Sequence, residues 1–296
     1  MKKTIFTGAA TALVTPMNAD NSVNYDMLRT LVNWQIDAGI DALVICGTTG
    51  EKSTLSYNEH VKVIEEAIKT ADGRVPIIAG AGSNDTVYSV GLCKEAIALG
   101  ADALLSVTPY YNKASQAGLI AHYNYIADRI DKPLIVYNVP SRTGVSIQPE
   151  TYLELSKHEN IVAIKEANGD VSSVAKTKQL VGDALDIYSG NDDQIIPIMS
   201  LGGKGVISVL SNILPKETHD MCMAYLNGDT KKAAELQLKY IPFINALFSD
   251  VNPIPVKEAM NLMGMNVGPV RLPLVPMNEQ KLEAMKQIMA GLGLIK

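Results

Sequence analysis

One pattern occurs twice in this chain and decides its fold: Ala38-Gly39-Ile40-Asp41-Ala42-Leu43-Val44-Ile45 and Leu99-Gly100-Ala101-Asp102-Ala103-Leu104-Leu105-Ser106. In each copy a helical pattern ends at a glycine, the residue that adopts the left-handed conformation after a helix at least cost. An aspartate and an apolar strand follow within a few residues. Short helix-to-strand turns of this kind recur in barrels of alternating strands and helices.

The same alternation runs through the first three quarters of the chain. Short apolar segments rich in β-branched residues are typical of parallel strands covered on both faces, and the longer amphipathic segments between them are typical of helices. We expect strands at Ala9–Val14, Ala42–Cys46, Val75–Ala79, Ala103–Val107, Leu134–Asn138, Ile161–Ile164, Leu185–Ser189 and Gly205–Val209, and intervening helices at Tyr57–Ala71, Thr86–Leu99, Gln116–Ile130 and Ser172–Val181. The sequence therefore predicts an α/β fold of the (β/α)8 TIM barrel type.

A doubly wound nucleotide-binding sheet is the main alternative. That fold requires Gly-x-Gly-x-x-Gly after the first strand, but Thr15-Pro16-Met17 stands there. After the eighth strand we expect only helices, at Lys216–Leu226, Lys231–Phe248, Pro255–Met263 and Glu279–Ala290. We expect residues 1–225 to form the barrel with the catalytic site, and no low-complexity linker separates this part from the helices that follow. Residues 226–296 are expected to form a helical C-terminal extension packed on the barrel.

Composition and charge narrow the classes of function. The chain has 296 residues, of which 47% are hydrophobic and 19% charged, as in ordinary globular proteins. A net charge of −5 argues against nucleic acid or an anionic membrane as the main partner. Cys46, Cys93 and Cys222 lack the spacing of a disulfide framework or a zinc site. No signal-like apolar segment follows Lys2 and Lys3, and no run reaches the ~20 residues of a membrane span, so we expect a cytoplasmic protein.

Lys165 is the most informative residue of the predicted barrel, whose active site belongs at the carboxyl ends of the strands. It directly follows the apolar run Ile161–Ile164. An unpaired ammonium there is costly, so its pKa falls, and a neutral amine is the nucleophile of Schiff-base chemistry. The alternative is a structural ion pair with a nearby carboxylate such as Glu166. Lys204 is a weaker candidate because it precedes its strand and therefore belongs at the opposite end of the barrel.

Hydroxyl and guanidinium groups follow other strands. Thr48 and Thr49, between two glycines, suit a small carboxylate, although an ordinary turn would have the same composition. Tyr137 and the pair Tyr110-Tyr111 can relay protons, or can be amphipathic residues at the rim of the core. Arg142 can bind a substrate carboxylate through two hydrogen bonds, and a surface ion pair is the alternative.

Several other chemistries have no support in the sequence. The histidines show no metal-ligand spacing, and no Gly-x-Ser-x-Gly nucleophile motif occurs. Asp192-Asp193 resembles a metal-binding pair, but capping of a helix after Gly190-Asn191 is a simpler account. We therefore expect no metal site.

Three of these segments occur together, in order, at the spacing of one known family: Gly47-Thr48-Thr49-Gly50-Glu51, Tyr137-Asn138-Val139-Pro140-Ser141-Arg142-Thr143-Gly144 and Ile164-Lys165-Glu166, with Pro109-Tyr110-Tyr111 between the first two. Over essentially its whole length the chain resembles the dihydrodipicolinate synthase / N-acetylneuraminate lyase superfamily of pyruvate-dependent class I aldolases. It is most similar to the synthase branch, because the sialic acid lyases usually lack an arginine at the Arg142 position.

The resemblance implies a class I, Schiff-base condensation of pyruvate with L-aspartate-4-semialdehyde. The product would be 4-hydroxy-tetrahydrodipicolinate, in diaminopimelate and lysine biosynthesis. Lys165 would form the imine with pyruvate, and Tyr137 would shuttle protons. Thr48 would link Tyr137 to Tyr111 in a hydroxyl relay.

The resemblance also implies how the substrates are held. Thr49 would bind the pyruvate carboxylate, and Arg142 would bind the carboxylate of the semialdehyde. Gly190 and Ile207 would line the site with backbone carbonyls. Because the covalent imine does the chemistry, no metal or organic cofactor is implied. Tyr111 would reach in from a neighbouring subunit, which implies a homo-oligomer, commonly a dimer of dimers.

Feedback by lysine is a point where this sequence departs from part of the family. Lysine-inhibited members bind lysine at a dimer interface, and His60, Asn84 and Tyr110 match that site. Tyr57 replaces a histidine, Tyr88 replaces an acidic residue, and Lys52 adds a positive charge where a cation must bind. We therefore predict weak or absent lysine feedback.

Two alternatives to the leading function stay open at this point. One is another pyruvate aldolase on the same scaffold, such as a sialic acid or keto-sugar-acid lyase, against which Arg142 argues. The other is a non-catalytic barrel that senses a keto acid. The complete set of Lys165, Tyr137, Thr48 and Tyr111 argues against it.

Overall fold

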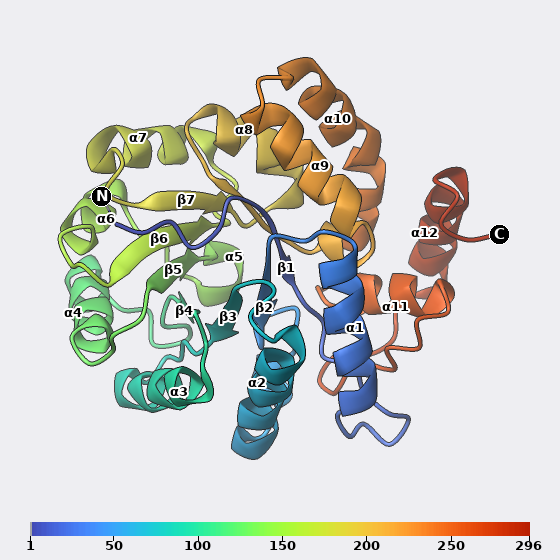
Figure 1. The fold of residues 1–296 in the computed structure, drawn as a ribbon, viewed down its shortest axis with the longest axis horizontal. Helices are drawn as coiled ribbons and strands as arrows, with labels where there is room; N and C mark the ends of the chain where they lie inside the picture. The colour runs from blue at the N-terminus through green and yellow to red at the C-terminus, as the bar shows by residue number, and fades with distance from the viewer. Residues whose placement is uncertain (1) are drawn as a thin grey trace.

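The computed structural model describes residues 2–296 and shows a closed barrel of eight parallel strands surrounded by helices (Figure 1). Each strand pairs with its neighbours in the chain, and β8 closes the ring on β1. The strands are β1 Gly8–Ala12, β2 Ala42–Ile45, β3 Ile77–Gly80, β4 Ala103–Val107, β5 Leu134–Asn138, β6 Ile161–Glu166, β7 Asp186–Ser189 and β8 Gly205–Ser208. The predicted (β/α)8 TIM barrel is confirmed.

Helices connect the strands and then continue past the barrel. They are α1 Tyr25–Asp37, α2 Tyr57–Ala71, α3 Thr86–Leu99, α4 Gln116–Ala127, α5 Pro140–Thr143, α6 Pro149–Leu155, α7 Val171–Val181, α8 Ile195–Ser200, α9 Pro215–Leu226, α10 Thr230–Leu247, α11 Ile254–Leu262 and α12 Glu279–Gly291. Three 3₁₀ turns, η1 Lys52–Thr54, η2 Asp192–Gln194 and η3 Leu210–Asn212, follow β2, β7 and β8.

Most predicted elements are present within a few residues of their expected bounds, and β4, β5, α2 and α3 match them fully. The third strand begins two residues later than expected, after Pro76, which has no N–H to donate to a ladder. The sixth strand is two residues longer, because Lys165 and Glu166 stay paired with β5 and β7. For α1, only its end at Gly39 was predicted. The helices α5, α6 and α8 were not predicted, because they are too short for an amphipathic period to show.

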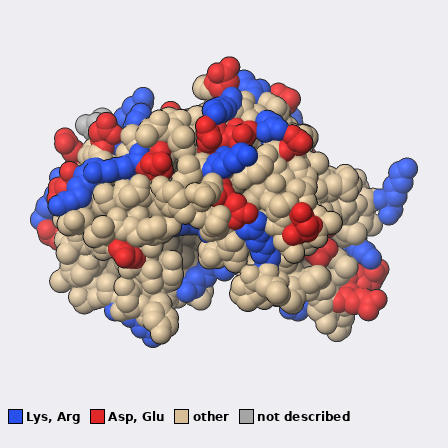
Figure 2. Space-filling model, turned by 90° about the horizontal axis from the view of Figure 1, so that it is seen from below, with Lys and Arg blue, Asp and Glu red and all other residues tan. Residues whose placement is uncertain are grey.

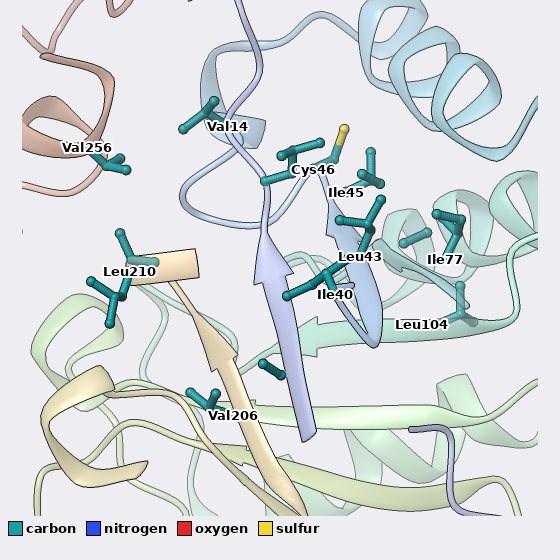
Figure 3. Close-up of a cluster of buried hydrophobic side chains, with 14 of the residues drawn as sticks. Val14, Ile40, Leu43, Ile45, Cys46, Ile77, Leu104, Val206, Leu210 and Val256 are labelled. Carbon is teal, nitrogen blue, oxygen red and sulfur yellow. The ribbon is translucent and has the colours of Figure 1, made fainter. Parts of the chain in front are cut away.

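The apolar core has two layers because side chains on a strand point alternately to its two faces. One cluster fills the barrel and includes Ala10, Val44, Leu105, Ala163 and Ile207. A larger cluster lies between the strands and the helices (Figure 3). Since Ala163 faces inward, Lys165 also faces inward, and Ile164 faces the helices.

The amino-terminal end of the barrel is filled by aromatic packing. The rings of Phe6 and Tyr188 stack with centroids 4.2 Å apart, and the Tyr188 hydroxyl donates to the Phe6 carbonyl oxygen at 2.6 Å. Lys204 directly precedes β8 and therefore lies at this end, opposite to the carboxyl ends of the strands, as predicted. Its backbone N–H donates to the carbonyl oxygen of Ile187 in β7.

The C-terminal helices pack against the barrel. Helix α10 contacts α9 and α8, and α11 contacts η3. Val256 of α11 belongs to the same buried cluster as Val14 and Leu210 of the barrel, and Figure 3 shows these three side chains. The proposed division of the chain at residues 225 and 226 stays a prediction.

Two observations concern the surface. On the face drawn in Figure 2, basic and acidic side chains are interspersed. Among residues 2–296, none of the helices has both the length and the apolar character that crossing a membrane demands.

Candidate active site

Lys165 extends from β6 into the barrel, and only 6% of it is exposed. Its Nζ lies 4.4 Å from the centroid of the Tyr137 ring, on the neighbouring strand β5. Burial lowers the pKa of Lys165 to about 8; the carboxylate of Asp192 opposes this shift, and the guanidinium of Arg142 adds to it. A large fraction of this amine is therefore neutral at mildly alkaline pH and can attack a carbonyl carbon.

The alternative of an ion pair between Lys165 and Glu166 is wrong. Consecutive residues of a strand point to opposite faces, so Glu166 faces away from Lys165. Its carboxylate accepts hydrogen bonds at 2.9 Å from the Tyr152 hydroxyl and from the Asn138 side chain. Burial raises the pKa of Glu166 to about 7. Within residues 2–296, Lys165 forms no ion pair.

Tyr137 and Thr48 bring two hydroxyl groups next to this amine. Tyr137 is 6% exposed, and burial raises its pKa, while the positive charge of Arg142 and a hydrogen bond with the Thr48 side chain lower it. The phenol therefore keeps its proton near neutral pH. Thr48 lies in the turn after β2 and is partly exposed. The structure brings Lys165, Tyr137 and Thr48 together as predicted.

Thr49 and Arg142 share a partner that the sequence did not reveal. The side-chain N–H of Asn252 donates to Thr49 Oγ1 at 3.0 Å, and Arg142 Nη2 donates to the Asn252 carbonyl oxygen at 3.0 Å. Asn252 lies between α10 and α11 and is buried. It is 203 residues from Thr49 in the chain, and nothing in its local sequence signals the contact.

Asp192 is a second residue whose place was not foreseen. The prediction that Asp192 caps the helix that follows Gly190-Asn191 is wrong. The N-cap residue of η2 is Asn191, and no side chain caps this turn. The buried Asp192 carboxylate instead accepts from the backbone N–H groups of Val209 and Leu210 at 3.0 and 2.9 Å, at the start of η3. Burial raises its pKa, and its charge acts on Lys165.

Gly190 lies next to the lysine, and Ile207 lies on β8. Gly190 follows β7, and a Cβ atom there would lie 2.8 Å from the Ala167 Cβ and 3.2 Å from the Lys165 Cε. A side chain at this position would therefore collide with Ala167 and crowd the lysine side chain. Ile207 is fully buried inside the barrel with Tyr137.

Tyr111 does not join this group within one chain. It is 90% exposed, with a left-handed backbone φ of 72°, in the loop after β4. A large aromatic ring so exposed suits contact with another protein surface better than a role in its own barrel.

A cavity of about 280 Å³ opens beside the tyrosine and threonine. It is lined by 14 residues, among them Thr48, Tyr137, Arg142, Tyr110 and Lys52. Burial lowers the pKa of Lys52 to about 8. The prediction of weak lysine feedback, which rests on Lys52, Tyr57 and Tyr88, stays a prediction.

A metal site has no support in the geometry. Among residues 2–296, no group of three or more His, Cys, Asp or Glu side chains is placed to hold a metal ion.

Known proteins of the same length and fold resemble this chain closely. The model of the dihydrodipicolinate synthetase family matches residues 5–291. The 4-hydroxy-tetrahydrodipicolinate synthase of Thermoanaerobacter sp. (strain X514) is 53% identical over 99% of this chain and 98% of its own length. Two solved structures superpose with TM-scores of 0.96: a chloride-inhibited dihydrodipicolinate synthase of Acinetobacter baumannii complexed with pyruvate (44% identical, 99% of this chain and 100% of that chain), and a monomeric dihydrodipicolinate synthase variant (42% identical, 98% of each chain).

The lowered pKa of Lys165 predicts a pH-dependent stability cost. The pKa falls from 10.5 to about 8 on folding, so the cost is fully present below pH 8 and disappears as the pH rises toward 10.5. At about 1.36 kcal/mol per unit, the upper bound is about 3 kcal/mol. Lys165→Met should therefore raise the free energy of unfolding at pH 7 by about 2 kcal/mol, and by much less at pH 9.5. Urea unfolding at both pH values measures this.

The matched control is Lys216→Met, because Lys216 pairs with Asp220 on the surface of α9. It should change the free energy of unfolding little at either pH. A Lys165→Met protein less stable than the wild type at pH 7 would contradict the desolvation argument.

Proposed function

This chain belongs to the dihydrodipicolinate synthetase family, and we propose that it condenses pyruvate with L-aspartate-4-semialdehyde to form 4-hydroxy-tetrahydrodipicolinate, in diaminopimelate and lysine biosynthesis. The observation that carries the proposal is the buried, unpaired Lys165 beside Tyr137 at the end of the barrel where active sites lie. The relatives carry the name of the synthase rather than of a sialic acid lyase, which supports this choice of reaction.

The first half of the reaction makes pyruvate nucleophilic. The neutral Lys165 amine attacks C2 of pyruvate, and loss of one water from the carbinolamine leaves a protonated imine. Tyr137 donates the proton that the departing oxygen needs, and Thr48 and the neighbour's Tyr111 return it from solvent. Thr49 binds the pyruvate carboxylate. The imine then accepts the electron pair of a C3–H bond, the proton leaves, and an enamine forms.

The second half joins the two substrates and frees the lysine. C3 of the enamine attacks the aldehyde carbon of the semialdehyde, while Arg142 binds its carboxylate. The aldehyde oxygen takes up a proton and becomes the hydroxyl group. The amino group of the semialdehyde then attacks C2, closes the ring as a cyclic imine and releases Lys165. One water is lost overall, in imine formation, and nothing is oxidised or reduced.

We propose that no metal or organic cofactor takes part, because the protonated imine is itself the electron sink. Carbonyl chemistry of this kind otherwise needs a Lewis acid to polarise the oxygen, and here the covalent bond to Lys165 replaces that role. Gly190 and Ile207 complete the proposed substrate pocket with their backbone carbonyl groups. Three buried free thiols suit a reducing compartment, and we place the enzyme in the cytoplasm.

We propose further that the enzyme works as a homo-oligomer, at least a dimer and with a dimer of dimers as the expected assembly. Partly or largely exposed apolar side chains follow the neighbouring strands β2, β3 and β4, a surface defined by Tyr57, Val87, Tyr88, Tyr110 and Tyr111. Covering this surface with a second copy would bury it and would carry Tyr111 toward the Thr48 hydroxyl of the neighbour. One relative is a monomeric variant, so the assembly needs its own test.

Borohydride trapping tests the imine. Reduction of the enzyme with pyruvate should fix one pyruvate-derived adduct on Lys165, found by peptide mass mapping, and the trapping rate should rise with pH around 8 as the amine becomes neutral. Lys165→Ala should fold normally, give no adduct and lose nearly all turnover. An adduct on Lys204, or none with the wild-type protein, would contradict the proposed function.

Arg142→Ala separates the two substrates. It should leave borohydride trapping of pyruvate within about threefold of the wild type, because Arg142 does not bind Lys165 or pyruvate, and should lower turnover with the semialdehyde by about 100-fold. Arg129→Ala, which removes an exposed arginine of the loop after α4, is the control. Loss of pyruvate trapping in Arg142→Ala alone would show that the arginine serves the first substrate.

Mixing two inactive variants tests the role of Tyr111. Tyr111→Phe and Lys165→Ala should each be nearly inactive. If Tyr111 serves the partner's site, each mixed dimer contains one complete site, so random exchange of subunits should restore about a quarter of wild-type activity. Subunit exchange is verified by native mass spectrometry. Mixed dimers without recovered activity, or a fully active monomer, would contradict the shared site.

A further inference from the structure

The C-terminal extension holds the loop that carries Thr48 and Thr49. This loop, Gly47–Glu51, follows β2 and precedes η1. Residues from beyond the barrel meet it at two points, through the Asn252 side chain at Thr49 in its middle and through Lys257 of α11 at Glu51, its last residue. Lys257 contacts no part of the proposed substrate pocket, so any effect on the reaction acts through this loop.

Glu51 is the most constrained residue of the loop. It has a left-handed φ of 53°, and only 3% of it is exposed. Both of its carboxylate oxygens are used: Oε1 accepts from Lys257 Nζ at 2.8 Å, and Oε2 accepts from the backbone N–H of Arg271 at 2.9 Å. The Glu51 backbone N–H donates to the Thr48 carbonyl oxygen at 3.1 Å. The carboxylate that faces the extension is therefore one hydrogen bond away from Thr48.

Lys257 joins three segments of the chain at one ammonium group. Besides Glu51, its Nζ donates to the backbone carbonyl oxygens of Thr15, after β1, and Pro269, after α11. The Thr15 hydroxyl in turn donates to the Gly50 carbonyl oxygen at 2.7 Å. Lys257 is 1% exposed, and burial lowers its pKa although the charge of Glu51 opposes the shift.

The energetics favour a geometric role over a stabilising one. A buried ion pair loses the hydration of both charges, and well-packed apolar side chains of similar volume are often at least as stabilising. Such a pair can instead fix the position of the segment that carries it, because hydrogen bonds have defined distances and angles. Here that segment is the loop that carries Thr48, which lines the cavity, and Thr49, which the proposed function assigns to pyruvate.

We propose that Lys257 and Glu51 are a positioning pair, which fixes the Gly47–Glu51 loop so that Thr49 and Thr48 meet pyruvate and Tyr137 in the geometry the imine requires. The inference rests on the proposed function and deepens it: α11 becomes part of the pyruvate-binding machinery. Displacements of about 1 Å at such a distance can lower rates by about 100-fold.

The pyruvate concentration that half-saturates borohydride trapping is the quantity to measure, because it reports imine formation without the second substrate. Lys257→Met should raise it by about tenfold or more, with a smaller change in the maximal trapping rate. Lys257→Arg keeps the positive charge and N–H donors but not the compact shape of the ammonium group, so it should raise half-saturation less than Lys257→Met does. The double variant Glu51→Gln with Lys257→Met leaves no unpaired buried charge and should show the same rise as Lys257→Met while folding more stably.

The control for lost stability is Met285→Ala, because Met285 is buried in α12 away from the loop. It should lower the melting temperature and leave half-saturation unchanged. A folded Lys257→Met protein with wild-type half-saturation would overturn the proposal, and so would an equal shift in Met285→Ala. If Lys257→Met does not fold, half-saturation of the double variant decides, and a wild-type value would overturn the proposal. A double variant that also fails to fold would show that the pair has a structural role only.

The same experiment separates the two levels of the argument. If the wild-type protein gives no pyruvate adduct, the proposed function is wrong. If the wild type gives the adduct on Lys165 and the Lys257 variants saturate as it does, only the positioning role is wrong.

Discussion

The burial of one unpaired ammonium group, that of Lys165, is the constraint on which the rest of the site depends. Removing a charged amine from water costs free energy that no ion pair within residues 2–296 returns, and the lowering of the Lys165 pKa to about 8 expresses that cost. The surroundings agree with this balance. The charge of Asp192 acts on the amine, but one of its carboxylate oxygens is already held by the backbone of η3, and the two side chains form no ion pair.

The alternation of side chains along β6 determines which residues lie on the same face as Lys165. Side chains alternate between the two faces of β6, so Ala163 and Lys165 face the interior and Glu166 faces α6. Small residues then make room: Ala163 lies one layer below the lysine, and Gly190 leaves the space beside its Cε. The barrel interior is a packed core, and the Lys165 amine lies within it beside Tyr137, which lines the cavity.

The sequence predicted the repeating strands and helices and the candidate residues at the ends of the strands. The eight strands follow from apolar periodicity, and the placing of Lys165, Tyr137 and Thr48 at one end follows from the rule that barrel sites lie at the carboxyl ends of strands. Their grouping into one site came from the family resemblance. Asn252 could not be predicted in this way, because a polar residue between two helices carries no local signal of its contact. The capping role assigned to Asp192 was wrong for a related reason: the sequence shows which residues can cap, and only the fold shows which turn lies within reach.

The contacts of the C-terminal extension matter most where the strands of the barrel end. Strands fix the residues that they carry, so Tyr137 and Lys165 owe their separation to the register of β5 and β6. The Gly47–Glu51 loop lies beyond the end of β2, where the sheet no longer determines its conformation. A loop that must hold two hydroxyl groups in place therefore needs an anchor outside the sheet, and Glu51 finds it in Lys257, 206 residues further along the chain. If the proposed positioning role holds, the C-terminal helices are not a separate addition to a complete enzyme, because Asn252 and Lys257 hold a loop of the barrel that the sheet does not fix.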